Sequence, residues 1–205
     1  MELVFQSQWL QVWDNVLSKS YCEKIKKAQL NQLENQQLRT KDYRTSNQSF
    51  IDAELNIDDR INDITFELTK IPKAHYEETS VIRYEKGQEY KIHHDYFHHD
   101  DPDFEGSFRN GGHRIATALF ILDGKCKGGE TYFPHMNHLR IKPKTGRCII
   151  WQNIFMSEVF GRPRIQYNTE SEHAGLPVES GEKWIATKWI REAPSVWYHN
   201  KYKKK

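Results

Sequence analysis

Between residues 80 and 191 the sequence is a succession of short β-rich runs separated by turns that contain glycine. Two of these turns are Asn110-Gly111-Gly112 and Gly128-Gly129. The runs that we interpret as strands cover residues 80–84, 115–122, 131–133, 139–141, 147–151, 164–167 and 183–191. Many short strands at this spacing are typical of a sandwich, a barrel or a jelly roll. This part of the chain is therefore predicted to be an all-β core.

The first third of the chain is predicted to be helical. Ser20 and Glu23 form a capping-box pattern, which marks the start of a helix that we expect to run to about Leu33. The residues of this helix that we expect to face the core are Cys22, Ile25 and Ala28.

A second helix is indicated by apolar residues that recur at spacings of four, three, four and three, which is one face of a helix. Asp58 and Asp59 favour its N-terminal end, because carboxylates are stabilised there, and Pro72 is expected to end it. The apolar residues of this face are Ile57, Ile61, Ile64, Leu68 and Ile71.

Length and composition indicate one globular domain over residues 1–205. The hydrophobic fraction of 37% is low, but 6 Trp, 10 Tyr and 10 Phe offer large rings for a core. The three cysteines, Cys22, Cys126 and Cys148, show no CxxC spacing, which argues against a disulfide scaffold and a zinc ribbon.

The charge pattern argues against a nucleic-acid partner. The net charge is +2, and four lysines in the last five residues account for more than this excess. We see no signal-peptide pattern at the N-terminus, and the longest apolar runs, 118–122 and 148–151, are far shorter than the roughly 20 residues of a spanning helix. We therefore expect a cytoplasmic protein without a membrane partner.

Histidines and aspartates gather in residues 92–101, where three His-x-Asp pairs occur. On an extended segment such a pair places both side chains on one face. With one more distant histidine it would supply two imidazoles and a carboxylate, a set that leaves positions open on Fe(II). The three pairs are His93/Asp95, His98/Asp100 and His99/Asp101.

The context favours the first pair. Residues 81–97, with Tyr84, Gly87 and Tyr90 leading to His93 and Asp95, resemble the metal-binding stretch of prolyl 4-hydroxylases. These enzymes are Fe(II)/2-oxoglutarate-dependent dioxygenases. Four further segments resemble family motifs in the same order: residues 110–119, 128–134, 142–147 and 173–184.

The resemblance implies a fold of the α+β class with a mainly β core. This fold is a double-stranded β-helix, or jelly roll, buttressed by N-terminal helices. The helical support would cover residues 14–75 approximately, and the catalytic jelly roll about 80–192. The family's closing motif places the distal metal histidine ten residues before the cosubstrate lysine, as His173 and Lys183 are placed here.

The resemblance also implies a role for particular residues. The catalytic residues would be His93, Asp95, His173 and Lys183, of which the first three bind iron. Lys183, Thr131 and Tyr84 would bind 2-oxoglutarate, since an ammonium and two hydroxyls can all donate to a carboxylate. Tyr90, Arg114 and Trp189 would line the substrate side.

The expected activity is hydroxylation of prolyl residues in a peptide or protein, with Fe(II), 2-oxoglutarate, O2 and ascorbate as cofactors and with release of succinate and CO2. One alternative keeps this chemistry and changes the substrate to another residue or to a free amino acid. Another is a non-catalytic binding module of the same fold.

Three features depart from the family pattern. Ile121 stands where many members carry Tyr, so one hydrogen-bonding group near the cosubstrate is absent. The run from His98 to Asp101 is expected to be a substrate loop or a hydrated turn. His135 and His138 are expected in an exposed loop, because an HxxH pair without nearby Cys or Glu is a poor zinc site.

Overall fold

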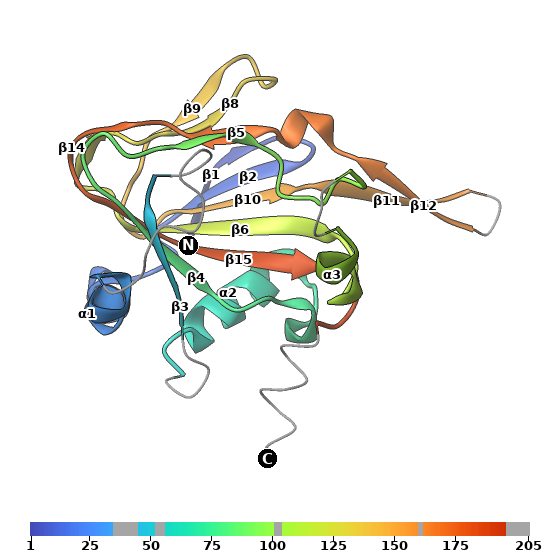
Figure 1. Ribbon diagram of the computed structural model, residues 1–205, viewed down its shortest axis with the longest axis horizontal. Coiled ribbons are helices and arrows are strands. Elements are labelled where there is room, and N and C mark those ends of the chain that lie inside the picture. The colour runs from blue at the N-terminus through green and yellow to red at the C-terminus, as the bar shows by residue number, and fades with distance from the viewer. Residues whose placement is uncertain (35–44, 52–55, 101–103, 160–161, 196–205) are drawn as a thin grey trace.

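The computed structural model describes residues 1–34, 45–51, 56–100, 104–159 and 162–195. Its centre consists of two antiparallel sheets (Figure 1). The larger sheet has the strand order β1 (Glu2–Gln6), β2 (Leu10–Asp14), β10 (Cys148–Gln152), β6 (Arg114–Asp123), β15 (Lys183–Arg191), β4 (Ser80–Tyr84) and β3 (Asn47–Phe50). The smaller sheet has the order β5 (Tyr90–His93), β13 (His173–Gly175), β8 (Thr131–Phe133) and β9 (Leu139–Ile141). The predicted jelly-roll core is confirmed.

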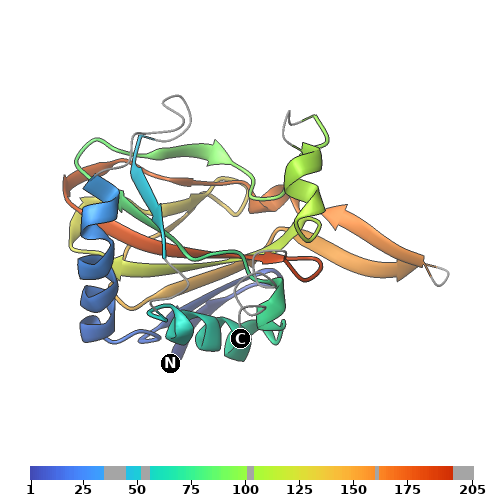
Figure 2. The same cartoon turned by 60° about the horizontal axis from the view of Figure 1, so that its bottom comes forward.

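Two short strand pairs complete the β structure. β7 (Cys126–Gly128) pairs with β14 (Val178–Gly181), and β11 (Ile154–Val159) pairs with β12 (Arg162–Tyr167). The β11–β12 hairpin extends away from both sheets, and α3 (Phe104–Arg109) lies near its base (Figure 2).

The two N-terminal helices cover the outer face of the larger sheet (Figure 2). Apolar side chains of α1 (Lys19–Glu34) and α2 (Asp59–Thr69), such as Ile25 and Ile61, belong to one buried cluster with the sheet residue Phe120. Fully burying an isoleucine contributes about 1.5–3 kcal/mol, so this face holds a substantial share of the core. In the described part of the chain, no helix has the length and apolar character needed to span a membrane.

The inner faces of the two sheets form a second core. Trp151 and Ile185 of the larger sheet belong to it together with Phe133 of the smaller sheet. Alternate residues along β15 therefore serve different layers, since Ala186 packs under the helices and Ile185 faces the other sheet. The functional pocket lies on this inner side.

The prediction that the first third is helical is wrong in part, because β1, β2 and β3 lie in it. In β2, Leu10, Val12 and Asp14 are buried and the residues between them are half-buried, which is the two-residue period of a strand. This strand pairs with β10 and extends the larger sheet beyond the predicted core.

The start and face of α1 also differ from the prediction. Ser18, rather than Ser20, caps the helix, because its Oγ accepts a hydrogen bond from the N–H of Tyr21 at 3.2 Å. Ala28 is exposed and Gln29 is buried. The buried positions 22, 25, 29 and 33 follow the helical period, so residue 29 lies on the buried face of the helix and residue 28 does not.

α2 occupies much of its predicted range. It ends because Lys70 adopts a left-handed conformation with φ of 60°, two residues before Pro72, so Ile71 lies beyond the helix. Asp58 does not cap the helix with its side chain. It is buried instead and accepts hydrogen bonds from Thr79 at 2.8 Å and from Lys188 at 3.3 Å, which connects α2 to β15.

Candidate active site

Two histidines and an aspartate meet on the inner face of the smaller sheet. His93 ends β5 and His173 begins β13, and the two residues are partners in the antiparallel register. Nε2 of His93 lies 3.6 Å from Oδ1 of Asp95, and Nε2 of His173 lies 3.9 Å from Oδ2. Within the described residues, these three side chains form the group that could hold a metal ion, with ligand atoms within 4.8 Å of one another.

Backbone carbonyls orient both imidazole rings. Nδ1 of His93 donates to the carbonyl of Lys91 at 2.8 Å, and Nδ1 of His173 donates to the carbonyl of Ser171 at 2.9 Å. A carbonyl oxygen only accepts, so Nδ1 carries the hydrogen in each ring and Nε2 keeps its lone pair. Both free lone pairs belong to the nitrogens nearest Asp95.

Burial and neighbouring groups prepare this cluster for a divalent metal. Burial alone would raise the pKa of Asp95, but His173 and His93 lower it by more, so the carboxylate is ionised. Burial lowers the pKa of His173 to about 4, and His93 adds to this effect. A deprotonated carboxylate and a neutral imidazole are the forms that bind metal. Two imidazoles and one carboxylate fit Fe(II) with positions left open.

The cluster opens into a pocket between the two sheets. Apolar side chains form much of its wall, including Leu119, Trp151 and Ile185. All three predicted cosubstrate residues line the same pocket: Lys183, Thr131 and Tyr84.

Lys183 is the buried cation of the pocket. It begins β15 opposite Tyr84 of β4, its side chain is almost fully buried, and Nζ lies 5.5 Å from the centroid of the Tyr84 ring. Burial lowers its pKa to about 8, although Cys126 and Glu130 act in the other direction. Among the described residues Lys183 forms no ion pair with a carboxylate, so it can offer its charge to an anionic ligand.

Gly129 makes room for the Lys183 side chain. Its φ of +70° lies in the left-handed region, and a Cβ added there would lie 3.2 Å from Cδ of Lys183. A side chain at this position would crowd the lysine as well as strain the backbone.

Two predicted substrate residues flank the metal cluster. The ring of Tyr90 stacks on that of His93 with centroids 3.7 Å apart, and Trp189 of β15 lines the pocket. The guanidinium of Arg114 lies 3.9 Å from the centroid of the Trp189 ring. Tyr90 and Trp189 thus line the pocket, and Arg114 lies against Trp189.

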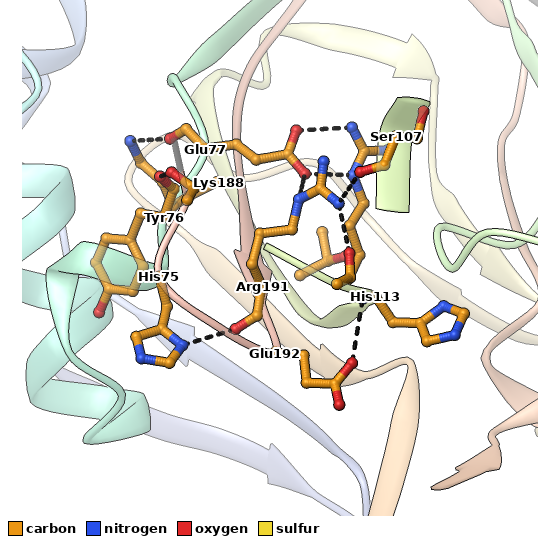
Figure 3. A network of polar contacts seen from close by, with 12 residues as sticks. His75, Tyr76, Glu77, Ser107, His113, Lys188, Arg191 and Glu192 are labelled. Atoms are coloured by element: carbon orange, nitrogen blue, oxygen red, sulfur yellow. Dashed lines mark hydrogen bonds and ion pairs between the residues drawn. The ribbon is translucent and has the colours of Figure 1, made fainter. Parts of the chain in front are cut away.

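Arg114 is held by a carboxylate that the sequence pattern did not reveal. Glu77 accepts from Nε of Arg114 at 2.7 Å and from Nη2 at 2.8 Å, which is a two-bond pairing of fixed geometry. Glu77 also pairs with Arg191, whose Nη1 donates to the carbonyls of Ser107 and Gly112 (Figure 3). Burial would raise the pKa of Glu77, but the two arginines lower it by more, so this carboxylate is charged.

The remaining histidines lie outside the cluster. His99 is hydrogen-bonded to the hydroxyl of Tyr167 at 3.2 Å, and that hydroxyl lies 3.4 Å from Nε2 of His113. The ring of His98 lies against Tyr96 with centroids 4.8 Å apart. His98 and His99 therefore belong to a group of aromatic rings near the β11–β12 hairpin. Asp101 lies outside the described residues.

The loop with His135 and His138 is exposed, as predicted. The expectation that it has no Glu neighbour is wrong, because Glu172 lies 2.8 Å from Nε2 of His135. His138 is bound instead to the hydroxyl of Tyr132 at 2.7 Å. Ile121 is fully buried in the inner core.

Comparison with known families gives one match over more than half of the chain. Residues 79–191 match the model of the 2OG-Fe(II) oxygenase superfamily. This range contains both strands of the metal cluster, the pocket lysine and Trp189.

Named relatives and a solved structure agree with this match. Prolyl 4-hydroxylase 2 of Arabidopsis thaliana is 32% identical over 82% of this chain, and this chain spans 59% of its length. A putative prolyl 4-hydroxylase of Acanthamoeba polyphaga mimivirus is 31% identical, with 88% of this chain and 73% of that protein covered. The viral collagen prolyl hydroxylase of Paramecium bursaria Chlorella virus-1, solved as a 2OG complex, is 29% identical with a TM-score of 0.68 and covers 91% of this chain and 98% of its own.

Proposed function

The chain belongs to the 2OG-Fe(II) oxygenase superfamily, and from that premise we propose that it hydroxylates prolyl residues in a peptide or protein. The cosubstrates are O2 and 2-oxoglutarate, and 2-oxoglutarate leaves as succinate and CO2. The similarity to prolyl 4-hydroxylases from a plant and a virus supports this choice of substrate.

His93, Asp95 and His173 are the residues that hold Fe(II). When bound, Fe(II) supplies the open coordination positions and the redox chemistry with O2. The chain keeps Asp95 ionised and directs the Nε2 lone pairs of both histidines to the same place. Ascorbate is the reductant that keeps the iron in the ferrous state.

Lys183 binds the distal carboxylate of 2-oxoglutarate. Its ammonium is buried without a carboxylate partner among the described residues, and its affinity for an anion is strengthened by the surrounding apolar wall. Thr131 and Tyr84 line the pocket beside it and can donate hydroxyl hydrogen bonds. Leu119, Trp151 and Ile185 give the pocket an apolar wall.

The peptide lies on the side of Tyr90, Arg114 and Trp189. The two rings can flank a proline ring, and Arg114 can donate its remaining N–H groups to a peptide carbonyl. Glu77 holds the guanidinium plane against Trp189, so Arg114 is oriented before the peptide arrives.

One observation carries this proposal: a two-histidine, one-carboxylate cluster and a buried lysine line the same pocket. The test is incubation with Fe(II), 2-oxoglutarate, O2 and a short proline-rich peptide, with mass spectrometry of the peptide and measurement of succinate. We expect the peptide to gain one oxygen atom on proline, and reactions without 2-oxoglutarate to leave it unchanged.

The alternatives give different results in the same assay. Oxygen on another residue, or faster reaction of free L-proline, would change the substrate and keep the chemistry. Absence of iron-dependent succinate release with every substrate would favour a non-catalytic binding module.

A further inference from the structure

Two buried polar side chains, Thr117 and Asn153, form a series of hydrogen bonds that ends at Asp95. Oγ1 of Thr117, on β6, donates to Oδ2 of Asp95 at 2.6 Å. Nδ2 of Asn153, between β10 and β11, donates in turn to Oγ1 of Thr117 at 2.9 Å. Thr117 and Asn153 are both fully buried, so water does not compete for these hydrogen bonds.

The direction of these two hydrogen bonds is determined by chemistry. An amide NH2 group only donates, so the oxygen of Thr117 accepts from Asn153 and the single hydroxyl hydrogen of Thr117 points to Asp95. The oxygen of Thr117 is then left to accept, and only the NH2 end of the Asn153 amide can donate to it. Asn153 therefore sets the orientation of the Thr117 hydroxyl.

The two ends of the Asn153 side-chain amide differ in their hydrogen bonding. Its Oδ1 is buried and has no hydrogen-bond partner among the described residues. Its amide end has Thr117 as its partner.

The backbone of Asn153 continues the network to a second metal ligand. Its carbonyl accepts from the N–H of Asn168 at 2.9 Å, and the carbonyl of Asn168 accepts from Oγ of Ser171 at 2.6 Å. The carbonyl of Ser171 is the acceptor that orients His173. Asp95 and His173 are thus connected by hydrogen bonds that are joined through the covalent structure of Asn153, Asn168 and Ser171.

This network lies at the base of the β11–β12 hairpin. Asn153 directly precedes β11 and Asn168 directly follows β12. Nδ2 of Asn168 donates to the carbonyl of Gln152 at 2.7 Å, which closes the base. The hairpin and the metal cluster therefore share the same supporting residues.

We propose that Thr117 and Asn153 are positioning residues of the metal site: Asn153 directs the Thr117 hydroxyl, and that hydroxyl holds the Asp95 carboxylate in its metal-binding orientation. This inference rests on the proposed metal site. Partners that hydrogen-bond to metal ligands typically contribute about 10- to 100-fold to metal affinity.

The test is titration of the metal-free protein with Mn(II), with free Mn(II) measured by electron paramagnetic resonance. Thr117→Val keeps the shape and removes the hydroxyl, and we expect it to weaken Mn(II) binding about 10- to 100-fold. Thr117→Ser keeps the hydroxyl and is expected to bind like the wild type. Equal affinity of Thr117→Val and the wild type, or equal weakening in Thr117→Ser and Thr117→Val, would overturn the proposal.

A matched control separates this effect from general loss of a buried hydroxyl. Thr65 is buried on α2 and donates to the carbonyl of Ile61 at 2.7 Å, on the opposite side of the larger sheet from the pocket. Thr65→Val is expected to leave Mn(II) affinity unchanged. The same weakening in Thr65→Val as in Thr117→Val would assign both effects to stability and contradict the proposal.

Asn153→Ala tests the order of the relay with Thr117 intact. We expect weaker Mn(II) binding in this variant, and no additional weakening when it is combined with Thr117→Val, because Asn153 acts through Thr117. Wild-type affinity in Asn153→Ala, or additive losses in the double variant, would refute the relay. The first of these outcomes, wild-type affinity in Asn153→Ala, remains measurable if Thr117→Val does not fold.

The same titration distinguishes this proposal from the metal site itself. His93→Ala is expected to abolish high-affinity Mn(II) binding. If His93→Ala binds Mn(II) as well as the wild type, the proposed metal site is wrong. If His93→Ala loses Mn(II) binding while the Thr117 and Asn153 variants keep wild-type affinity, the metal site stands and the role of Thr117 and Asn153 is refuted.

Discussion

His93 and His173 are cross-strand partners in the pairing of β5 with β13, and the centroids of their rings are 4.3 Å apart. Asp95 follows His93 by two residues and turns to the same centre. The positions of the three candidate ligands therefore depend on one strand pairing.

The first prediction concerns which histidines bind iron. His93→Ala should abolish turnover and sharply weaken iron binding, because it removes one of three ligands. His98→Ala and His99→Ala should leave metal affinity nearly intact, since these rings contact Tyr96 and Tyr167. Metal titration of the three variants is the measurement, and loss of iron in His99→Ala but not in His93→Ala would disprove the assignment.

The second prediction concerns the cosubstrate. A charge-assisted hydrogen bond contributes about 1.5–3 kcal/mol, so Lys183→Ala should weaken 2-oxoglutarate binding about 10- to 150-fold. Iron affinity should barely change, because Lys183 is not part of the ligand cluster. Calorimetric titration of the metal-loaded protein checks this, and an unchanged dissociation constant for 2-oxoglutarate would exclude the role of Lys183.

The third prediction is a pH dependence of 2-oxoglutarate binding. The pKa of Lys183 is lowered to about 8 by burial, so the ammonium is present below pH 8 and is lost as the pH rises above it. A carboxylate binds the charged form, so affinity should be constant below pH 8 and fall by up to tenfold per pH unit above it. Lys183→Arg stays charged and should remove this decline; the same decline in both proteins would point to another group.

The fourth prediction concerns the peptide. Arg114→Ala should raise the peptide KM about 10- to 150-fold, the equivalent of one hydrogen bond from a charged group. Decarboxylation of 2-oxoglutarate without peptide should change little, because the group that we propose Arg114 to bind is a carbonyl of the peptide and not 2-oxoglutarate. Trp189→Ala should act in the same direction through lost ring packing.

Steady-state kinetics with a proline-rich peptide and with free L-proline check the fourth prediction. Efficient turnover of free proline that is insensitive to Arg114→Ala would refute the peptidyl substrate.

The fifth prediction concerns the support of Arg114. Glu77→Gln keeps the size of the side chain and removes the charge that holds two arginines. It should raise the peptide KM in the same direction as Arg114→Ala, and the two changes combined should be less than additive. The 2-oxoglutarate affinity serves as the control. Fully additive effects would show that Glu77 does not act through Arg114.

Much of the β core could be predicted because its strands carry local signals. Four strands have the predicted bounds, β4, β8, β9 and β15, and each is a short β-rich run next to turn residues. β2 lacks such a signal, because a buried Asp14 and a half-buried Trp13 interrupt the alternation of apolar and polar residues. The prediction for Ala28 is wrong because a small apolar residue gives little indication of which side of a helix faces the core.

The residues of the candidate site also divide into those that carry a local sequence signal and those that carry none. His93, Asp95, His173 and Lys183 lie in compact motifs, and the structure brings all four to one pocket. Glu77, Thr117 and Asn153 have no such motif. Glu77 meets Arg114 across 37 residues and Asn153 meets Thr117 across 36, so these contacts follow from the packing of the strands and have no local pattern.

The pairing of β5 with β13 also has a consequence for folding. Side chains alternate between the two faces of a strand, so a slip of one residue in either strand would turn His93 or His173 away from the pocket. A misaligned sheet would therefore lack one ligand and could not retain the metal. Metal binding at the proposed site would therefore stabilise the correctly aligned chain over a misaligned one.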